Sequence, residues 1–127
     1  MIQIFPHSFL SMMTTVIVHL YFLFKRKIIK TSLWYYPYKS HQPTIYFIIR
    51  TGFLTWEQLT LYLQDIRKHS EFAKIIIIGR DIDYEFLLKN HYRVFGVIDT
   101  SERKSPLFIW KQVCFYLDGI YGKRTAF

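Results

Sequence analysis

The sequence predicts an α/β domain in which a five-stranded parallel sheet lies between two layers of helices. The first observation is the run of four isoleucines at 75–78, flanked by Lys74 and Gly79. An apolar strand without polar residues at alternate positions is covered on both faces, as the central strands of parallel sheets are. The second observation is a similar apolar run from Thr44 to Ile49. The third is that strand-like and helix-like segments alternate, which is the pattern of a parallel sheet covered by helices.

The first fifty residues predict three strands and one long helix. Residues 2–5 form a short apolar strand that ends at Pro6, and residues 8–24 form an almost wholly apolar helix. Residues 28–36 mix Lys, Thr and Ser into a β-rich run, which is typical of an edge strand. The segment 37–43 is polar and has proline at both ends. It has room for no more than one helical turn, so the second helix of the fold is expected to be reduced.

Helix-start signals organise the second half. Thr55 and Gln58 form a capping box, and the basic residues 67–69 suit the last turn of that helix. Asp81 or Asp83 is expected to cap a short helix through Asn90, and residues 94–98 form a further strand. Ser105 and Pro106 begin the last helix, which glycines 119 and 122 end. Right-handed crossovers then favour the strand order 2-1-3-4-5 known from flavodoxin.

The apolar segment 8–24 has two interpretations. Its 17 or so residues lie at the lower limit for crossing a bilayer, and no charged residue precedes them. Four polar residues recur at helical spacing and predict a helix on the sheet with a thin wet face: Ser8, Ser11, Thr15 and His19. The alternative is a membrane-anchored protein held by residues 8–24, with basic residues 25–27 on the cytoplasmic side of the inner membrane.

Charge is distributed unevenly along the chain. The formal net charge is +8, and all nine acidic residues lie between Glu57 and Asp118. The first 56 residues therefore carry only basic charge, which favours an anionic partner such as nucleic acid or a membrane surface. A Lys- and Ile-rich composition typical of AT-rich bacterial genes is the alternative explanation. The basic half contains no nucleic-acid recognition motif.

The patterns that carry enzyme chemistry are missing from the sequence, so we expect no catalytic, cofactor-binding or metal-binding residues. No phosphate-binding glycine motif occurs, and the five histidines are scattered without ligand spacing. His7 beside Ser8 is the best catalytic pairing, but Ser8 is more simply a helix cap. Arg50 and Arg80 could converge on an anion at the sheet edge. The single cysteine, Cys114, excludes an internal disulfide, and its place on an apolar stripe predicts an inert buried thiol.

Residues 74–123 carry a resemblance to the receiver domains of bacterial response regulators, and the resemblance extends over nearly the whole chain. It includes the apolar strand 75–78, the short helix 84–90, the Gly-containing strand 95–98, and the helix that Ser105 and Pro106 begin. The closest likeness is to the CheY-like receivers of LuxR-type transcription regulators. It implies a three-layer sandwich over residues 1–122, with residues 123–127 as the start of a linker or tail.

The chain departs from receivers where their phosphorylation chemistry takes place. Receivers hold Mg²⁺ with acids after the first strand and phosphorylate an Asp at the end of the third. Here those places carry Phe5-Pro6-His7 and Ile49 or Arg50. The switch residues after the fourth and fifth strands are replaced by Gly79 or Arg80 and by Asp99 or Thr100. The resemblance is therefore to a degenerate, phosphorylation-independent receiver without bound cofactor.

The function implied by this resemblance is a non-catalytic regulatory or dimerisation module of a bacterial, cytoplasmic transcription regulator. Receivers commonly pair through the fourth helix, fifth strand and fifth helix, so a homodimer or another regulator is the expected partner. Four aromatic residues are candidate contacts there, although each also suits a core position: Tyr92, Phe95, Trp110 and Phe115. Nucleic acid would be bound only through a C-terminal helix-turn-helix domain that this chain lacks. The chain would then be a fragment, a truncated product or a stand-alone protein.

Overall fold

The computed structural model describes residues 2–27, 29–35, 44–50, 54–90, 92–101 and 105–121. Its elements follow in the order β1 (Ile2–Phe5), α1 (Phe9–Phe24), β2 (Thr31–Ser32), β3 (Ile45–Arg50), α2 (Trp56–His69), β4 (Lys74–Gly79), α3 (Tyr84–Lys89), β5 (Gly96–Asp99) and α4 (Pro106–Tyr121). The sheet has five strands in the order β2-β1-β3-β4-β5, and every pairing is parallel. This is the flavodoxin- and CheY-like arrangement, and it confirms the predicted fold class.

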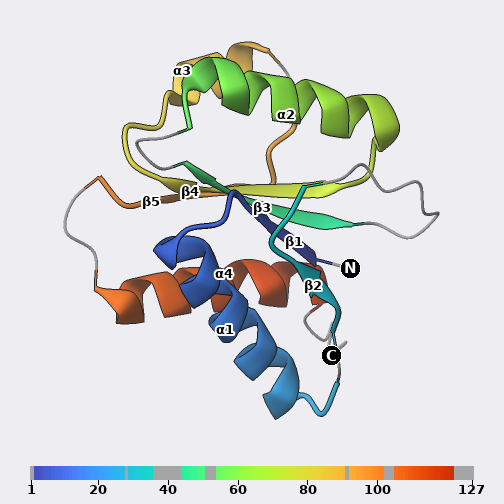
Figure 1. The fold of residues 1–127 in the computed structure, drawn as a ribbon, viewed down its shortest axis with the longest axis vertical. Helices are drawn as coiled ribbons and strands as arrows, with labels where there is room; N and C mark the ends of the chain where they lie inside the picture. Colours follow the sequence, from blue (N-terminus) through green and yellow to red (C-terminus); the bar gives the residue numbers. More distant parts are fainter. Residues whose placement is uncertain are drawn as a thin grey trace, which may run out of the picture.

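The helices form two layers around the sheet. Figure 1 shows α1 and α4 on one face, with α2 and α3 on the other. The expected second helix would lie between β2 and β3, in the segment 37–43, which is outside the described residues. α3 follows β4 and α4 follows β5, which are the places of the fourth and fifth helices in the flavodoxin- and CheY-like arrangement.

The four isoleucines of β4 show why a central strand needs apolar residues on both faces. Ile76 and Ile78 belong to the core cluster on the α1–α4 side. Ile75 and Ile77 belong to the cluster on the α2–α3 side, and all four side chains are fully buried. Because successive side chains point to opposite faces, two helical layers are required to cover them.

The predicted edge strand 28–36 is wrong in length, because among residues 29–35 β2 pairs with β1 only at Thr31 and Ser32; residues 28 and 36 lie outside the described residues. Ser32 ends the strand locally. Its hydroxyl accepts a hydrogen bond from the Trp34 amide at 3.1 Å and donates one to the Trp34 carbonyl at 2.9 Å. Such side-chain turns compete with the backbone hydrogen bonds of a strand, and they can end a short edge strand. The last strand likewise runs from Gly96 to Asp99 rather than over 94–98.

The wet face predicted for residues 8–24 is also wrong. Ser11 is fully buried, although His19 is exposed. The hydroxyls of Ser11 and Thr15 each donate to a backbone carbonyl one turn earlier, at 2.8 Å, and need no water. The outward face of α1 is instead largely apolar. Within the described residues no helix combines the length and apolarity needed to cross a bilayer.

Arg67, near the end of α2, joins the helix to two loops. Its guanidinium donates hydrogen bonds to the backbone carbonyls of Tyr92 at 2.7 Å, Arg93 at 2.8 Å, Ala73 at 2.9 Å, Glu71 at 3.1 Å and Ser70 at 3.4 Å. A planar group with five donors suits such a set of acceptors. Arg67 therefore fixes the approach to β4 and the segment before β5 against α2.

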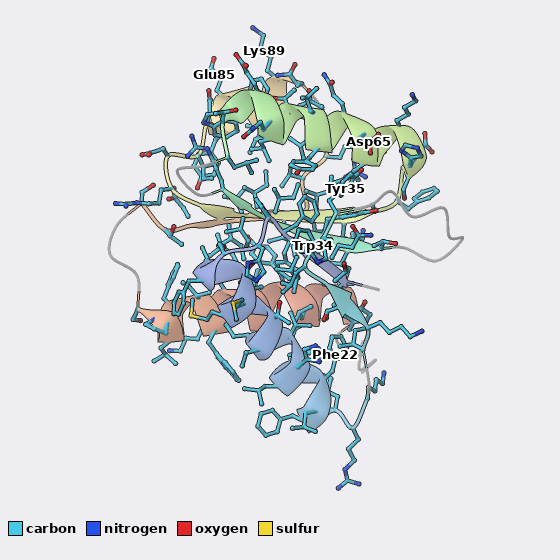
Figure 2. The ribbon with its side chains drawn as sticks, viewed as in Figure 1. Phe22, Trp34, Tyr35, Asp65, Glu85 and Lys89 are labelled. Atoms are coloured by element: carbon cyan, nitrogen blue, oxygen red, sulfur yellow. The ribbon has the colours of Figure 1, made fainter. Side chains whose placement is uncertain are left out.

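The α1–α4 layer is held together by aromatic rings and one long-range hydrogen bond. Figure 2 labels Phe22, whose ring meets that of Tyr121 edge-on at 5.1 Å. The Tyr21 hydroxyl donates to Asp118 Oδ1 at 2.6 Å. Burial, together with this hydrogen bond, raises the pKa of Tyr21 above its ordinary value, so the phenol stays protonated.

Candidate functional site

Receivers react at the carboxyl ends of their strands, so we consider that edge first. After β1, Ser8 accepts a hydrogen bond from the Ser11 amide at 3.1 Å and caps α1. Its neighbour His7 is exposed and stacks on Trp34 at 6.4 Å. The hydroxyl is thus used as a cap, and the structure does not pair it with His7 as a nucleophile.

A hollow of about 600 Å³ opens beside this loop. It is lined by Pro6, His7, Ser8, Phe9, Leu54, Gln58 and Tyr62. None of these residues carries a carboxylate, whereas Mg²⁺ prefers carboxylate oxygens. The lining present here does not suit the metal that a receiver needs.

The third strand ends on a cation rather than on a carboxylate. Ile49 is buried in the core, and Arg50 follows it. The Arg50 guanidinium lies over the Trp56 ring at 4.9 Å and donates a hydrogen bond to the Arg80 carbonyl at 2.8 Å. Arg50 therefore braces the loop after β4. Its contact with this loop is made to the Arg80 backbone, and convergence of the two guanidinium groups on an anion stays a prediction.

Glycine at the end of β4 serves close packing. A Cβ on Gly79 would lie 2.4 Å from the Arg50 carbonyl oxygen, so a side chain there would push β3 and β4 apart. By the resemblance, Gly79 or Arg80 would stand where a receiver has the hydroxyl residue that reads its phosphoryl group. Close approach of two backbones explains the glycine.

The acidic residues at this edge hold loops. Asp99 accepts hydrogen bonds from the Tyr84 hydroxyl at 3.0 Å, the Ser101 amide at 2.9 Å and the Ser101 hydroxyl at 2.5 Å. The same hydroxyl oxygen accepts from the Asp81 amide at 3.0 Å. Burial and the bond to Asp99 raise the pKa of Tyr84, which stays a donor. Across the part of the chain that is described, no group of three or more His, Cys, Asp or Glu residues could hold a metal ion.

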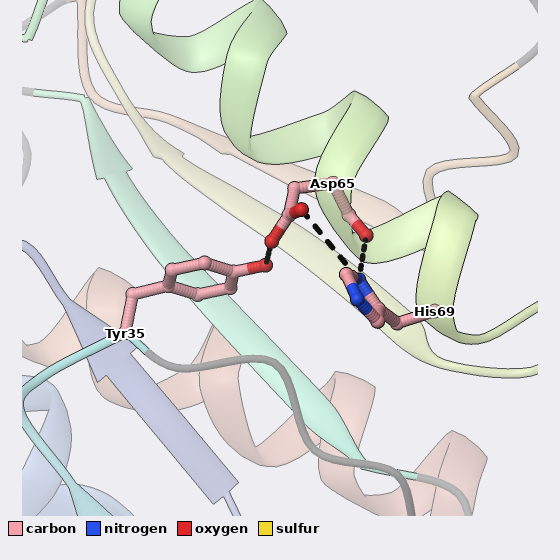
Figure 3. Close-up of polar contacts among 3 residues, drawn as sticks. All are labelled: Tyr35, Asp65 and His69. Atoms are coloured by element: carbon pink, nitrogen blue, oxygen red, sulfur yellow. Dashed lines mark hydrogen bonds and ion pairs between the residues drawn. The ribbon is translucent and has the colours of Figure 1, made fainter.

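A second polar cluster, which the sequence analysis missed, ties the segment after β2 to α2. The Tyr35 hydroxyl donates to Asp65, and His69 Nδ1 lies 3.5 Å from Asp65 Oδ1 (Figure 3). His69 Nδ1 also lies 2.9 Å from the Asp65 carbonyl oxygen. Burial and the carboxylate raise the pKa of Tyr35 far above its ordinary value. The hydrogen bond from Tyr35 to Asp65 joins the segment after β2 to α2, so this cluster holds the two parts of the chain together.

The face formed by α3, β5 and α4 carries a group of exposed apolar side chains. Leu88 is 77% exposed, Phe115 is 66% exposed and Phe95 is 37% exposed. A hollow of about 340 Å³ adjoins Leu88 and is lined by Tyr84, Leu87, Leu88, Arg93, Val94 and Val97. On the same short helix, Glu85 and Lys89 point into solvent (Figure 2). Contiguous apolar patches on a small domain commonly mark interaction sites.

Tyr116 lies under this face and closes the open edge of the sheet. Its hydroxyl accepts a hydrogen bond from the Val97 amide at 3.2 Å and donates to the Val97 carbonyl at 3.1 Å. Its ring lies between those of Phe95, at 6.0 Å, and Phe115, at 5.3 Å. A Cβ on Gly96 would lie 2.1 Å from the Tyr116 ring, so this contact requires glycine.

The four aromatic residues proposed as contacts separate into two groups. Phe95 and Phe115 are exposed, so their interaction role stays a prediction. Tyr92 is buried beside Phe86, and Trp110 packs against the α1–α4 core. Leu88 and Tyr84 are exposed on the same face and were missed. Their i, i+4 spacing places them on one side of α3, but the sequence alone does not show that this side faces solvent.

Cys114 is half-buried on α4, and burial raises the pKa of its thiol. A thiol with a raised pKa carries little thiolate at neutral pH. The inert role expected from its place on an apolar stripe stays a prediction.

Comparison of the chain with known protein families, with curated proteins and with solved structures found no match.

Proposed function

We propose that this chain is a non-catalytic, phosphorylation-independent receiver-like module that acts by pairing through its α3–β5–α4 face. The observation that carries the proposal is the group of exposed apolar side chains on that face, Leu88, Phe95 and Phe115, together with the 340 Å³ hollow that Leu88 helps to line. The two-fold pairing of such faces would bury apolar surface that a monomer leaves in water.

The described carboxyl edge of the sheet supports the non-catalytic part of the proposal. β1 ends at Phe5 and β3 at Arg50, so neither strand end supplies a carboxylate. Without carboxylates in these places a receiver can neither hold Mg²⁺ nor form an acyl phosphate. The module would therefore act by binding its partner, and phosphorylation would not control that binding.

The wider setting follows from the resemblance alone. We assign the chain to the cytoplasm of a bacterium, as a regulatory part of a transcription regulator. DNA would be bound by a separate helix-turn-helix domain, and the homodimer would set the spacing of two such domains.

Sedimentation equilibrium at micromolar to tens of micromolar concentrations tests the pairing. We expect a dimer for the unchanged chain and a monomer for the double variant Leu88→Ser/Phe115→Ser, because each substitution replaces an apolar contact with a hydroxyl. Leu61→Ser is the matched control, since Leu61 is 65% exposed on α2. A monomer across this range, or equal weakening by the control, would refute the proposed interface.

A second measurement tests the phosphorylation-independent part. Incubation with acetyl phosphate and Mg²⁺ should add no phosphoryl group, as seen by intact-protein mass spectrometry, and should not change the dimer equilibrium. A stable phosphoryl adduct, or a shift in that equilibrium, would contradict the proposal.

A further inference from the structure

The outward face of α1 is largely apolar, although exposed His19 interrupts it, and the core does not use this face. Phe9, Met12, Val16 and Leu23 are all exposed and follow one another at helical spacing. Phe24, the last residue of the helix, is 78% exposed. The opposite side of α1 packs on the sheet and on α4. This face is separate from the α3–β5–α4 face, because the two lie on different helices.

Cations follow directly at the end of this apolar face. Lys25, Arg26 and Lys27 are exposed, and so is Lys30. No acidic residue occurs in the first 56 residues of the chain. Figure 1 shows α1 running obliquely away from the sheet, so that its C-terminal end protrudes from the domain on the side opposite α2. Exposed apolar side chains and unbalanced positive charge are therefore combined at a protruding corner.

The backbone holds this corner in a defined shape. The Lys27 amide donates to the Phe22 carbonyl at 2.9 Å and the Arg26 amide to the Leu23 carbonyl at 3.0 Å, which is the Schellman pattern of a helix end. Arg26 occupies the left-handed position of that motif, at φ 55°, where glycine is the usual residue. The position carries a cation in a backbone conformation that disfavours a side chain.

A hollow lies between these cations and α4. Its volume is about 420 Å³, and it is lined by Phe24, Lys25, Arg26, Lys27 and Tyr121. Three of these five side chains are positively charged, and two are aromatic. Such a lining offers charge to a phosphate group and apolar contact to the glycerol and acyl carbons next to it.

We propose that the α1 corner binds the surface of an anionic lipid bilayer. Leu23 and Phe24 enter the boundary between headgroups and acyl chains. Lys25, Arg26 and Lys27 bind the lipid phosphates around them. The helix lies on the bilayer and does not cross it, which suits its 16 residues and its protruding, exposed position.

Charge complementarity favours a bilayer over a second copy of the chain. Two α1 helices paired in parallel would bring their basic ends together. Paired antiparallel, they would place each basic end against the first turn of the other helix, which has no acidic residue. An anionic bilayer offsets all of these cations at once and also accepts the apolar side chains.

Vesicle flotation of the full chain tests the proposal. Vesicles of phosphatidylcholine with about one third phosphatidylglycerol should retain the protein, whereas pure phosphatidylcholine vesicles should bind it at least tenfold more weakly. The triple variant Lys25→Gln/Arg26→Gln/Lys27→Gln should lose about a hundredfold in affinity for the anionic vesicles, at about fivefold per cation. Leu23→Ser/Phe24→Ser should also lose binding, by about tenfold or more.

Matched controls keep the test independent of folding and of the dimer. Leu61→Ser removes an equally exposed leucine from α2 and Lys68→Gln an exposed cation, and both should leave flotation unchanged. Leu88→Ser/Phe115→Ser should abolish the dimer and still float with anionic vesicles. Leu23→Ser/Phe24→Ser should lose flotation and keep the dimer.

Four outcomes would overturn the proposal. They are the absence of flotation with anionic vesicles, equal flotation with neutral ones, and equal loss of binding in the controls. The fourth is a chain that shifts duplex DNA at the same salt without binding vesicles, since its cations would then serve nucleic acid.

Discussion

Replacing Arg67 with methionine should destabilise the domain more than any other substitution of an exposed or half-exposed charge in α2. Methionine keeps the apolar stem and removes the guanidinium. Four carbonyls then lose donors at 2.7–3.1 Å, those of Tyr92, Arg93, Ala73 and Glu71. A net value of about 0.5–1.5 kcal/mol for each hydrogen bond gives roughly 2–6 kcal/mol. Water reaches this half-exposed site and replaces part of the loss, so we expect about 2–3 kcal/mol.

Urea unfolding followed by circular dichroism measures this loss. For a chain of this size, about 2–3 kcal/mol corresponds to a midpoint lowered by roughly 1–2 M urea and a Tm lowered by roughly 8–15 °C. Arg67→Lys should retain only part of the stability, because an ammonium has one nitrogen where the guanidinium has three. Lys68→Met, at the exposed neighbouring position, is the control and should stay within about 0.5 kcal/mol. If Arg67→Met unfolds like this control, the carbonyl contacts contribute nothing and the reasoning fails.

Three further predictions concern backbone conformation, packing and pH. Arg26→Gly should raise the free energy of unfolding by about 0.5–1 kcal/mol, since glycine adopts φ 55° freely. The same variant should bind vesicles about fivefold more weakly, because it loses one cation. A lower free energy of unfolding would show that the Arg26 backbone is not strained. Gly96→Ala should lower the free energy of unfolding by about 1–3 kcal/mol, because the new Cβ meets the Tyr116 ring. In a Tyr116→Ala background the ring is absent, so the same change should have little effect. An equal loss in that background would exclude the clash as the cause. Because the folded-state pKa values of Tyr21 and Tyr35 are raised, their contribution is complete below the unfolded tyrosine pKa of about 10 and declines as pH rises above it. Unfolding measured from neutral to alkaline pH should show this decline, and a Tyr21→Phe/Tyr35→Phe variant should show less of it; an unchanged slope would argue against the assignment.

Elements with strong local signals could be predicted from the sequence. The capping box at Thr55 and Gln58 forms as expected, with Thr55 Oγ1 accepting from the Gln58 amide at 3.2 Å. The four isoleucines of β4 require burial on both faces whatever surrounds them, and the sheet order followed from this strand and the alternation of elements. Such features depend on neighbouring residues, and the tertiary structure does not override them.

Features that depend on distant residues could not be predicted in this way. Arg67 matched a favourable charge at a helix end, and nothing in its surroundings in sequence pointed to Tyr92 or Arg93. The burial of Ser11 was missed because a hydroxyl bonded to its own helix behaves as an apolar group, which hydropathy patterns do not register. β2 was overestimated because the Ser32 hydroxyl bonds to the Trp34 backbone and ends the strand, although its own residues favour β-structure.

The same limit applies to the candidate surfaces. Leu88 and Phe115 are leucine and phenylalanine in helices, which usually predicts core, and only the packing of α3 and α4 exposes them. The basic residues at 25–27 were visible in the sequence. That Leu23 and Phe24 are exposed beside these basic residues depends on which side of α1 faces the sheet.

The phenol that Tyr116 places on Val97 restricts how molecules of this protein can assemble. A strand from another molecule that joined the sheet at β5 would first have to displace the Tyr116 hydroxyl, which is already bonded to both the amide and the carbonyl of Val97. At the opposite border, the described part of the chain offers only Thr31 and Ser32 of β2 as a template. Growth into extended ribbons is disfavoured at either border, so association is left to side-chain surfaces, which close on themselves after a small number of subunits.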